Sequence, residues 1–137
     1  RDGFADLHLF RGVTGGARFA PAGLARGIGW VGTMAGTYPD LVVTAQGSLQ
    51  ALSRNESVGR HRWRETVTIA WRGGRFVVAG FTHQSRDTLE PGLSRHCDAN
   101  LLTGRGVLDG EPFETRRGGI PVEAWEARLV PAECAAG

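Results

Sequence analysis

The chain has 137 residues, of which 41% are hydrophobic and 22% are charged. This length and composition favour one folded domain, residues 1–137, and exclude a disordered chain. No apolar run approaches the roughly 18 residues of a membrane-spanning helix. The 21 glycines disfavour long helices. We therefore predict an all-β fold with at most short helices, a small antiparallel sandwich or barrel-like sheet built from consecutive hairpins.

The basic residues are unusual because all of them are arginine, whereas the numbers of basic and acidic residues are nearly equal. All 16 basic residues are arginine, and the net charge is only +2. Such a small net charge supports neither strong nucleic-acid binding nor adsorption to a membrane surface. Two explanations account for the exclusive use of arginine. One is a GC-rich coding bias, and the other is selection for bidentate binding of anions by guanidinium groups. The sequence leaves both readings open.

Two cysteines, Cys97 and Cys134, predict one disulfide bond. They lack the spacing of a redox-active pair and are too few for a zinc site without help from histidine. A disulfide here would stabilise the fold by roughly 4 kcal/mol if it acts by restricting the unfolded chain. It also implies an oxidising compartment. Because the chain starts at Arg1 instead of Met, we expect a periplasmic or secreted protein whose signal has been removed.

The first third of the chain contains one clear strand followed by a long segment whose structure is ambiguous. Residues 4–10 read as a short strand. The glycine-rich stretch 11–37 is expected to be mostly loop, with a strand near 28–34. A β-branched run at 41–45, followed by Gln-Gly and the returning segment 48–52, predicts a hairpin.

The strongest structural signal is a second hairpin around Gly73 and Gly74. Residues 62–71 alternate between apolar and polar side chains, and residues 75–81 return with a second apolar run. Two adjacent glycines suit a type I′ turn, which needs a positive φ at both positions. Trp63 and Trp71 are predicted to face inward.

A two-residue turn also fixes the register of this hairpin. Trp71 should lie opposite Phe76, and Ile69 opposite Val78. Continued without interruption, the same register places His83 opposite Arg64.

The last third contains a third hairpin and an ambiguous end. Asp109 and Gly110 predict a turn between short strands, and Pro112 indicates an edge position. Residues 124–130 read equally as a last strand or as one helical turn, which Pro131 ends.

Catalytic and metal sites have little support in this sequence. His83, Ser85 and Asp87 are weak candidates for a hydrolase site, since they would share one face of a continuing strand. The structural alternative is that Asp87 caps a turn by accepting backbone N–H groups. His96 and its neighbours Cys97 and Asp98 point to opposite strand faces, so no metal site and no cofactor is expected.

The segment 53–64 holds four arginines, a histidine and a tryptophan within twelve residues. A functional interpretation is a surface that binds an acidic protein or an anionic envelope polymer. The alternative is a solvated strand face whose charge blocks edge-to-edge pairing. Nucleic acid is disfavoured because the tryptophans are predicted to face inward. The candidate binding residues are Arg54, Ser57, Arg60, Arg62, Arg64 and His83.

The region 38–106 resembles a group of exported bacterial proteins without an assigned activity. The most specific part of this resemblance is the Cys-Asp-x-Asn-Leu-Leu-Thr-Gly segment that begins at Cys97, and the other shared segments are 39–43, 47–49, 76–81 and 86–89. The resemblance implies export and a β fold, and no activity.

Three functions from different classes follow as expectations. The leading one is a small exported binding protein, in which the loop 57–60 acts as bacterial lysozyme inhibitors do when they insert a serine and a basic residue into an acidic cleft. The alternatives are a small hydrolase using His83 with Asp87 or Ser85, and a structural envelope protein without a ligand.

Overall fold

The computed structural model describes residues 3–16, 18–32, 36–126 and 129–135, and within them it is an all-β protein without an α-helix. This confirms the predicted fold class, although the sheet does not close into a barrel. The strands are β1 (Gly3–Val13), β2 (Arg18–Val31), β3 (Asp40–Val43), β4 (Leu49–Asn55), β5 (His61–Arg72), β6 (Arg75–Asp87), β7 (Ser94–Asn100), β8 (Arg105–Leu108), β9 (Glu111–Glu114) and β10 (Ile120–Pro121).

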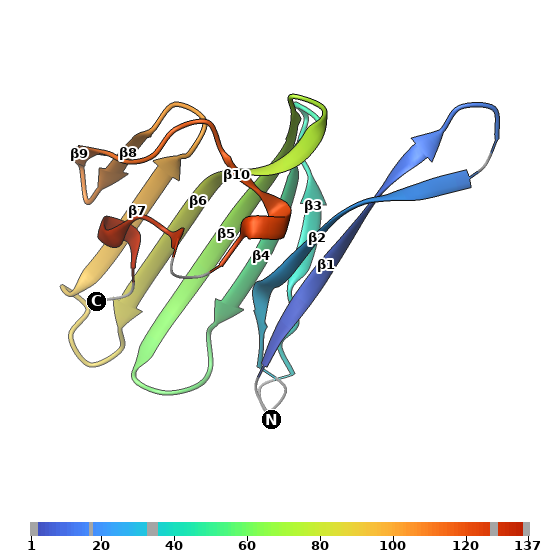
Figure 1. Ribbon diagram of the computed structural model, residues 1–137. Helices are drawn as coiled ribbons and strands as arrows, with labels where there is room; N and C mark the ends of the chain where they lie inside the picture. The colour runs from blue at the N-terminus through green and yellow to red at the C-terminus, as the bar shows by residue number, and fades with distance from the viewer. Residues whose placement is uncertain (1–2, 17, 33–35, 127–128, 136–137) are drawn as a thin grey trace.

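One antiparallel sheet forms the body of the molecule (Figure 1). Its strands follow chain order from β3 to β9, and β10 pairs with the start of β6. The three predicted hairpins are therefore confirmed as β3–β4, β5–β6 and β8–β9. Gly73 and Gly74 have φ values of 60° and 79°, as the type I′ turn requires. Pro112 lies in β9, at the end of the strand order.

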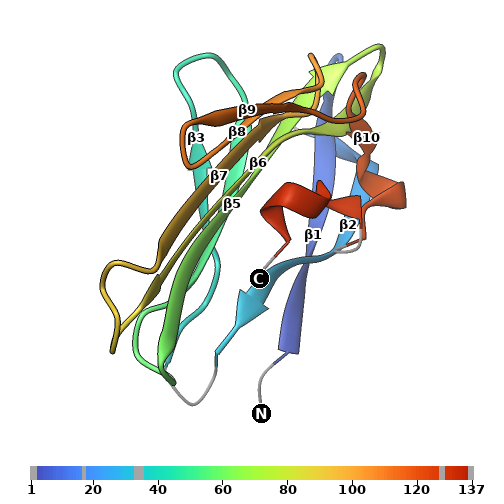
Figure 2. The same cartoon turned by 90° about the vertical axis from the view of Figure 1, so that its left-hand side faces the viewer.

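A separate hairpin, β1–β2, lies on one side of this sheet together with the C-terminal turns (Figure 2). We call the covered side the inner face and the opposite side the outer face. Leu9 from β1 and Ala25 and Ile28 from β2 are buried in the core beneath the hairpin.

The prediction of loop over most of residues 11–37 is wrong, because β2 occupies Arg18–Val31. Its glycines allow close packing of backbone and do not break the strand. A Cβ atom on Gly29 would lie 2.8 Å from Pro39 Cγ, and one on Gly23 would lie 2.9 Å from Val122 Cγ2. Part of the expected strand at 28–34, residues 33 and 34, lies outside the described residues.

The β5–β6 hairpin contains a bulge that changes its register. Trp71 lies opposite Phe76 and Ile69 opposite Val78, as predicted, but Thr68 lies opposite Gly80, so Ala79 is an extra residue. The carbonyl of Ala79 accepts a hydrogen bond of 2.9 Å from the backbone N–H of Leu101. From this point on, every residue of β6 faces the side opposite to the one predicted.

The bulge corrects the predicted position of His83. Its partner in β5 is Glu65, and the partner of Arg64 is Gln84. The uninterrupted register had placed His83 opposite Arg64. Because side chains alternate along a strand, the one-residue shift moves Phe81 and His83 to the inner face and Gln84 and Arg86 to the outer face.

The C-terminal segment is fastened to the inner face by the predicted disulfide bond. Cys97 in β7 and Cys134 are bonded, with their Cα atoms 5.2 Å apart. Two 3₁₀ turns, Val122–Ala124 and Ala132–Cys134, follow β10. The backbone N–H of Leu129 donates to the carbonyl of Glu126 at 2.9 Å, and the described residues between 124 and 130 form no strand. Residues 127 and 128 lie outside the described residues.

The hydrophobic core lies between β4–β7 and the covering elements. Its largest fully buried side chains are Ile69, Leu101, Ile120, Val67, Val78 and Val122. Trp125 is also buried, whereas Trp71, which was predicted to face inward, is 37% exposed and lies outside the buried core. Trp71 lies near the hairpin turn, where its ring meets Phe76 edge to face and the Arg11 guanidinium 4.6 Å from its centroid.

Trp125→Ala should lower the free energy of unfolding by about 3–5 kcal/mol, because it empties a buried site. Trp71→Ala should cost about 1–2 kcal/mol, since it removes one aromatic pair and one cation–π contact at the surface. Urea denaturation followed by circular dichroism measures both. An equal or larger loss for Trp71→Ala would contradict this description of the core.

Candidate binding surface

The outer face carries four arginines that lie opposite one another in pairs. Arg54 of β4 lies opposite Arg64 of β5, and Arg62 of β5 lies opposite Arg86 of β6. Cross-strand partners share a face, and so do residues two apart along a strand, so all four guanidinium groups project from the outer face. We call these four residues the arginine patch.

Two carboxylates accompany the arginine patch. Asp40 accepts a hydrogen bond of 3.0 Å from Arg54. Glu56 lies 3.2 Å from Arg64 and 3.5 Å from Arg86. The hydrogen bond from Arg64, ahead of the other causes, lowers the pKa of Glu56 below its ordinary value. Arg62 instead donates to the backbone carbonyls of Gly59 and Glu56. Four cations therefore share two anions.

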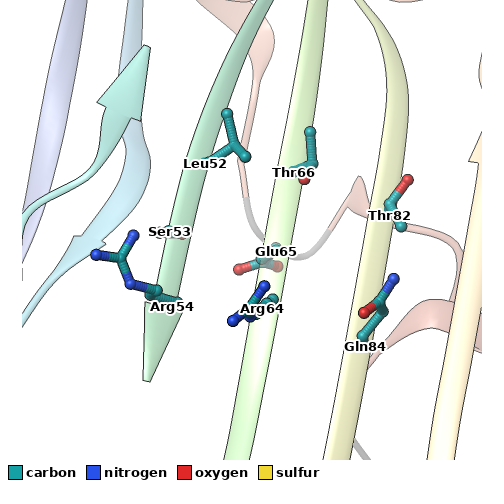
Figure 3. Close-up of a pocket in the computed structure, with 8 residues that line it drawn as sticks. All are labelled: Leu52, Ser53, Arg54, Arg64, Glu65, Thr66, Thr82 and Gln84. Atoms are coloured by element: carbon teal, nitrogen blue, oxygen red, sulfur yellow. The ribbon is translucent and has the colours of Figure 1, made fainter. Parts of the chain in front are cut away.

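The arginine patch borders two shallow hollows on the outer face. Figure 3 shows the larger, of about 310 Å³, where side chains from β4, β5 and β6 lie side by side. Its outer-face lining comprises Leu52, Arg54, Arg64, Thr66, Thr82 and Gln84. A second hollow of about 210 Å³ adjoins it, and both share Arg64 and Gln84. Guanidinium, amide and hydroxyl groups thus converge where a planar anion can be bound by several donors.

Arg60 has a different environment from the arginine patch. Its Nε donates to Asp87 Oδ1 at 2.8 Å, and its Nη2 donates to Glu90 Oε1 at 3.2 Å. Asp87 also accepts the backbone N–H groups of Leu89 and Glu90, as the turn-capping alternative predicts. The hydrogen bond from Arg60, followed by these backbone bonds, lowers the pKa of Asp87 to about 2 against the raising effect of burial. Arg60 therefore fastens the loop between β4 and β5 to the end of β6.

The three weak catalytic candidates are not joined into one site. His83 lies on the inner face, with its Nδ1 3.8 Å from Glu65 Oε1 and its ring stacked on Trp63. No hydrogen bond connects His83 with Ser85 or Asp87, all of which the structure describes. The hydrolase interpretation stays a prediction, and this geometry adds no support to it.

The candidate binding residues are divided between three places. Arg54, Arg62 and Arg64 lie together in the arginine patch, Ser57 and Arg60 lie in the loop before β5, and His83 lies on the inner face. Sequence reasoning missed Arg86, Gln84 and Glu56. The uninterrupted hairpin register gave no sign of Arg86 beside Arg62, because that neighbourhood is created by the bulge at Ala79.

Comparison with known proteins gives no family assignment: no protein-family model, no curated protein and no solved structure matches the chain. Across the described ranges, no three His, Cys, Asp or Glu side chains are grouped as metal ligands would be. None of the helical segments that the structure describes is long and apolar enough to cross a membrane.

Stability should fall in acid partly through Asp87. A carboxyl whose folded-state pKa is about 2 and whose ordinary value is 3.8 stabilises the fold above pH 3.8 and loses that effect as the pH falls towards 2. Asp87→Asn should be less stable at neutral pH and should lose less stability over this acidic interval than the wild type. Urea midpoints at several pH values measure the difference.

The matched control is Glu111→Gln, at an exposed position in β9. It should keep the wild-type dependence on pH. A parallel pH dependence in the wild type and Asp87→Asn would contradict the assigned role of Asp87.

Proposed function

We propose that this protein binds an anionic partner, an acidic protein or an anionic polymer of the cell envelope, through the arginine patch. The observation that carries this proposal is the direct opposition of Arg54 to Arg64 and of Arg62 to Arg86 on one sheet face. Like charges directly opposite each other destabilise a sheet. A partner that supplies carboxylates or other anions would relieve this repulsion.

Three of the four guanidinium groups are accessible enough to make such contacts, whereas Arg62 is half-buried and donates to backbone carbonyls. The side chains of Arg54, Arg64 and Arg86 are 46%, 64% and 51% exposed. Their ion pairs with Asp40 and Glu56 are surface pairs, which contribute about 0–1 kcal/mol each. An incoming anion can therefore replace or share these partners at little cost. Gln84 and Thr66 of the larger hollow supply further hydrogen-bond donors, whereas the hydroxyl of Thr82 already donates to Asp98 at 2.9 Å.

The loop 57–60 contributes less to this proposal than the sheet face does. Arg60 is already held by Asp87 and Glu90, so its guanidinium is committed to the fold. The analogy with lysozyme inhibitors needs a basic residue that is free to enter an acidic cleft. The arginine patch meets this requirement better than Arg60, and we place the contact there.

The proposed location is the periplasm or the extracellular space of a bacterium. The disulfide bond between Cys97 and Cys134 is consistent with an oxidising environment. Export would bring the arginine patch into contact with anionic envelope components, which fits the proposed partners.

Binding to poly-L-glutamate tests the proposal with a defined carboxylate polymer. We expect saturable binding that weakens as ionic strength rises towards physiological values, where charges are screened over about 8 Å. The double variant Arg54→Gln/Arg64→Gln should bind roughly tenfold more weakly, a change of about 1.4 kcal/mol. Its thermal stability should be unchanged or higher, because it removes an opposed like-charge pair.

The β5–β6 hairpin supplies a matched control at its other end. Arg72 and Arg75 also lie opposite each other, next to the turn. Arg72→Gln/Arg75→Gln removes the same amount of charge from another opposed pair of the same sheet and should retain most of the affinity. Equal weakening in both double variants would indicate adsorption through net charge and would refute a defined site. Retention of envelope proteins or polymers by the wild type, and their loss with Arg54→Gln/Arg64→Gln, would extend the test to natural partners.

A further inference from the structure

The inner face carries a continuous row of aromatic rings that the proposed function does not use. Trp30 of β2 meets Trp63 of β5 edge to face at 5.4 Å between ring centroids. Trp63 stacks on His83 at 6.1 Å, and His83 stacks on Phe81 at 6.5 Å. Phe81 in turn contacts Trp125 at 6.1 Å. Strands far apart in sequence and the C-terminal segment thus contribute to one aromatic surface.

This row forms one side of a cavity of about 320 Å³. The rest of the lining includes Phe4 of β1, residues 27–29 of β2, and Val130, Cys134 and Ala135 of the C-terminal segment. The disulfide bond to Cys97 holds that segment in place. The cavity falls within the size range of sites for small organic molecules, roughly 300–1,000 Å³. Its walls are therefore fixed by covalent and sheet contacts.

One carboxylate, Glu65, belongs to this mainly aromatic lining. Its side chain is only 30% exposed. The Nδ1 atom of His83 lies 3.8 Å from Glu65 Oε1, which is beyond hydrogen-bond distance. Within the described chain no hydrogen-bond donor is paired with the Glu65 carboxylate. The Glu65 carboxylate is therefore open to a positively charged ligand that enters the cavity.

We propose that this cavity binds a small organic cation, an alkylammonium or quaternary ammonium group. Tryptophan rings are the best cation–π partners among side chains, and Trp30 and Trp63 are both partly exposed at the cavity. Glu65 supplies the counter-charge at the same wall. Methyl groups on the cation would contact the aromatic faces while the charge lies near the carboxylate.

The same features disfavour other classes of ligand. An anion would be repelled by Glu65 at the cavity wall. A neutral apolar molecule would fill the space and leave the carboxylate desolvated without a partner, which costs free energy. Although Glu65 also borders the larger outer hollow, this site and the arginine patch use different side chains, which lie on opposite faces of the sheet. Failure of either proposal therefore leaves the other intact.

Choline and its uncharged carbon analogue 3,3-dimethyl-1-butanol provide a direct test on the wild-type chain. The two molecules have nearly the same shape and differ in charge. Isothermal titration calorimetry and tryptophan fluorescence at mildly alkaline pH should show saturable choline binding. Choline should bind at least roughly tenfold more tightly than the analogue, since only the cation can make a cation–π contact with the tryptophan rings and an ion pair with Glu65. Equal affinities, or no saturable choline binding, would overturn the proposal.

Variants then locate the site. Glu65→Gln keeps the side-chain shape and should weaken choline binding roughly tenfold or more while leaving the analogue unaffected. Trp30→Phe should retain part of the affinity and Trp30→Leu should lose it. Glu114→Gln, in β9 away from the cavity, is the matched control and should bind choline as the wild type does.

Two results would refute this location of the site. Unchanged choline affinity in a folded Glu65→Gln variant would show that the carboxylate is not the counter-charge. Equal loss in Glu65→Gln and Glu114→Gln would show that choline responds to net charge alone. If Glu65→Gln does not fold, the wild-type comparison of choline with its analogue and the Trp30→Phe and Trp30→Leu pair still decide the outcome.

Discussion

The extra residue at Ala79 is the local constraint on which both faces of this sheet depend. Before the bulge, the hairpin follows the register that its glycine turn sets, with Ile69 opposite Val78. After it, the side chains of β6 exchange faces. The carbonyl of Ala79 is satisfied by the N–H of Leu101, so the disruption of the ladder leaves this polar group paired. The one extra residue thus determines whether each later side chain of β6 lies on the inner or the outer face.

The consequences differ on the two sides of the sheet. On the inner face, Phe81 and His83 join Trp63 and complete the aromatic row that reaches Trp125. On the outer face, Gln84 and Arg86 join the arginines of β4 and β5. Without the bulge, Arg86 would lie on the inner face and His83 beside Arg64. The separation of an aromatic side from a cationic side follows from this one irregularity.

The β1–β2 hairpin and the C-terminal segment, which cover the inner face, are held to the rest of the fold by different contacts. At one end, Gly29 lets β2 lie close to Pro39 and Ser53, and Gly23 lets it lie close to Val122 of the first C-terminal turn, because neither glycine carries a side chain. At the other, the disulfide bond fastens the chain end to β7, and Trp125 fills the space beside Phe81. Arg60 has a comparable structural role at the end of β6, where it ties a loop to the buried Asp87. Arginines in this chain therefore divide into those that hold the fold and those that remain available at the surface.

Much of the fold was predictable because its signals are local. The Gly73–Gly74 turn set the start of the hairpin register, alternation marked β5 and β6, and two cysteines admitted one pairing. The glycine-rich β2 was not predictable, because its glycines serve distant contacts with Pro39 and Val122. Three of the four patch arginines were found because they are close in sequence, and Arg86 was missed because only the bulge brings it beside Arg62. The sequence by itself determined the β class, three hairpins with their turns, and the disulfide bond. The tertiary structure decided which side chains share a face, because a side-chain period of two makes facing sensitive to a single inserted residue.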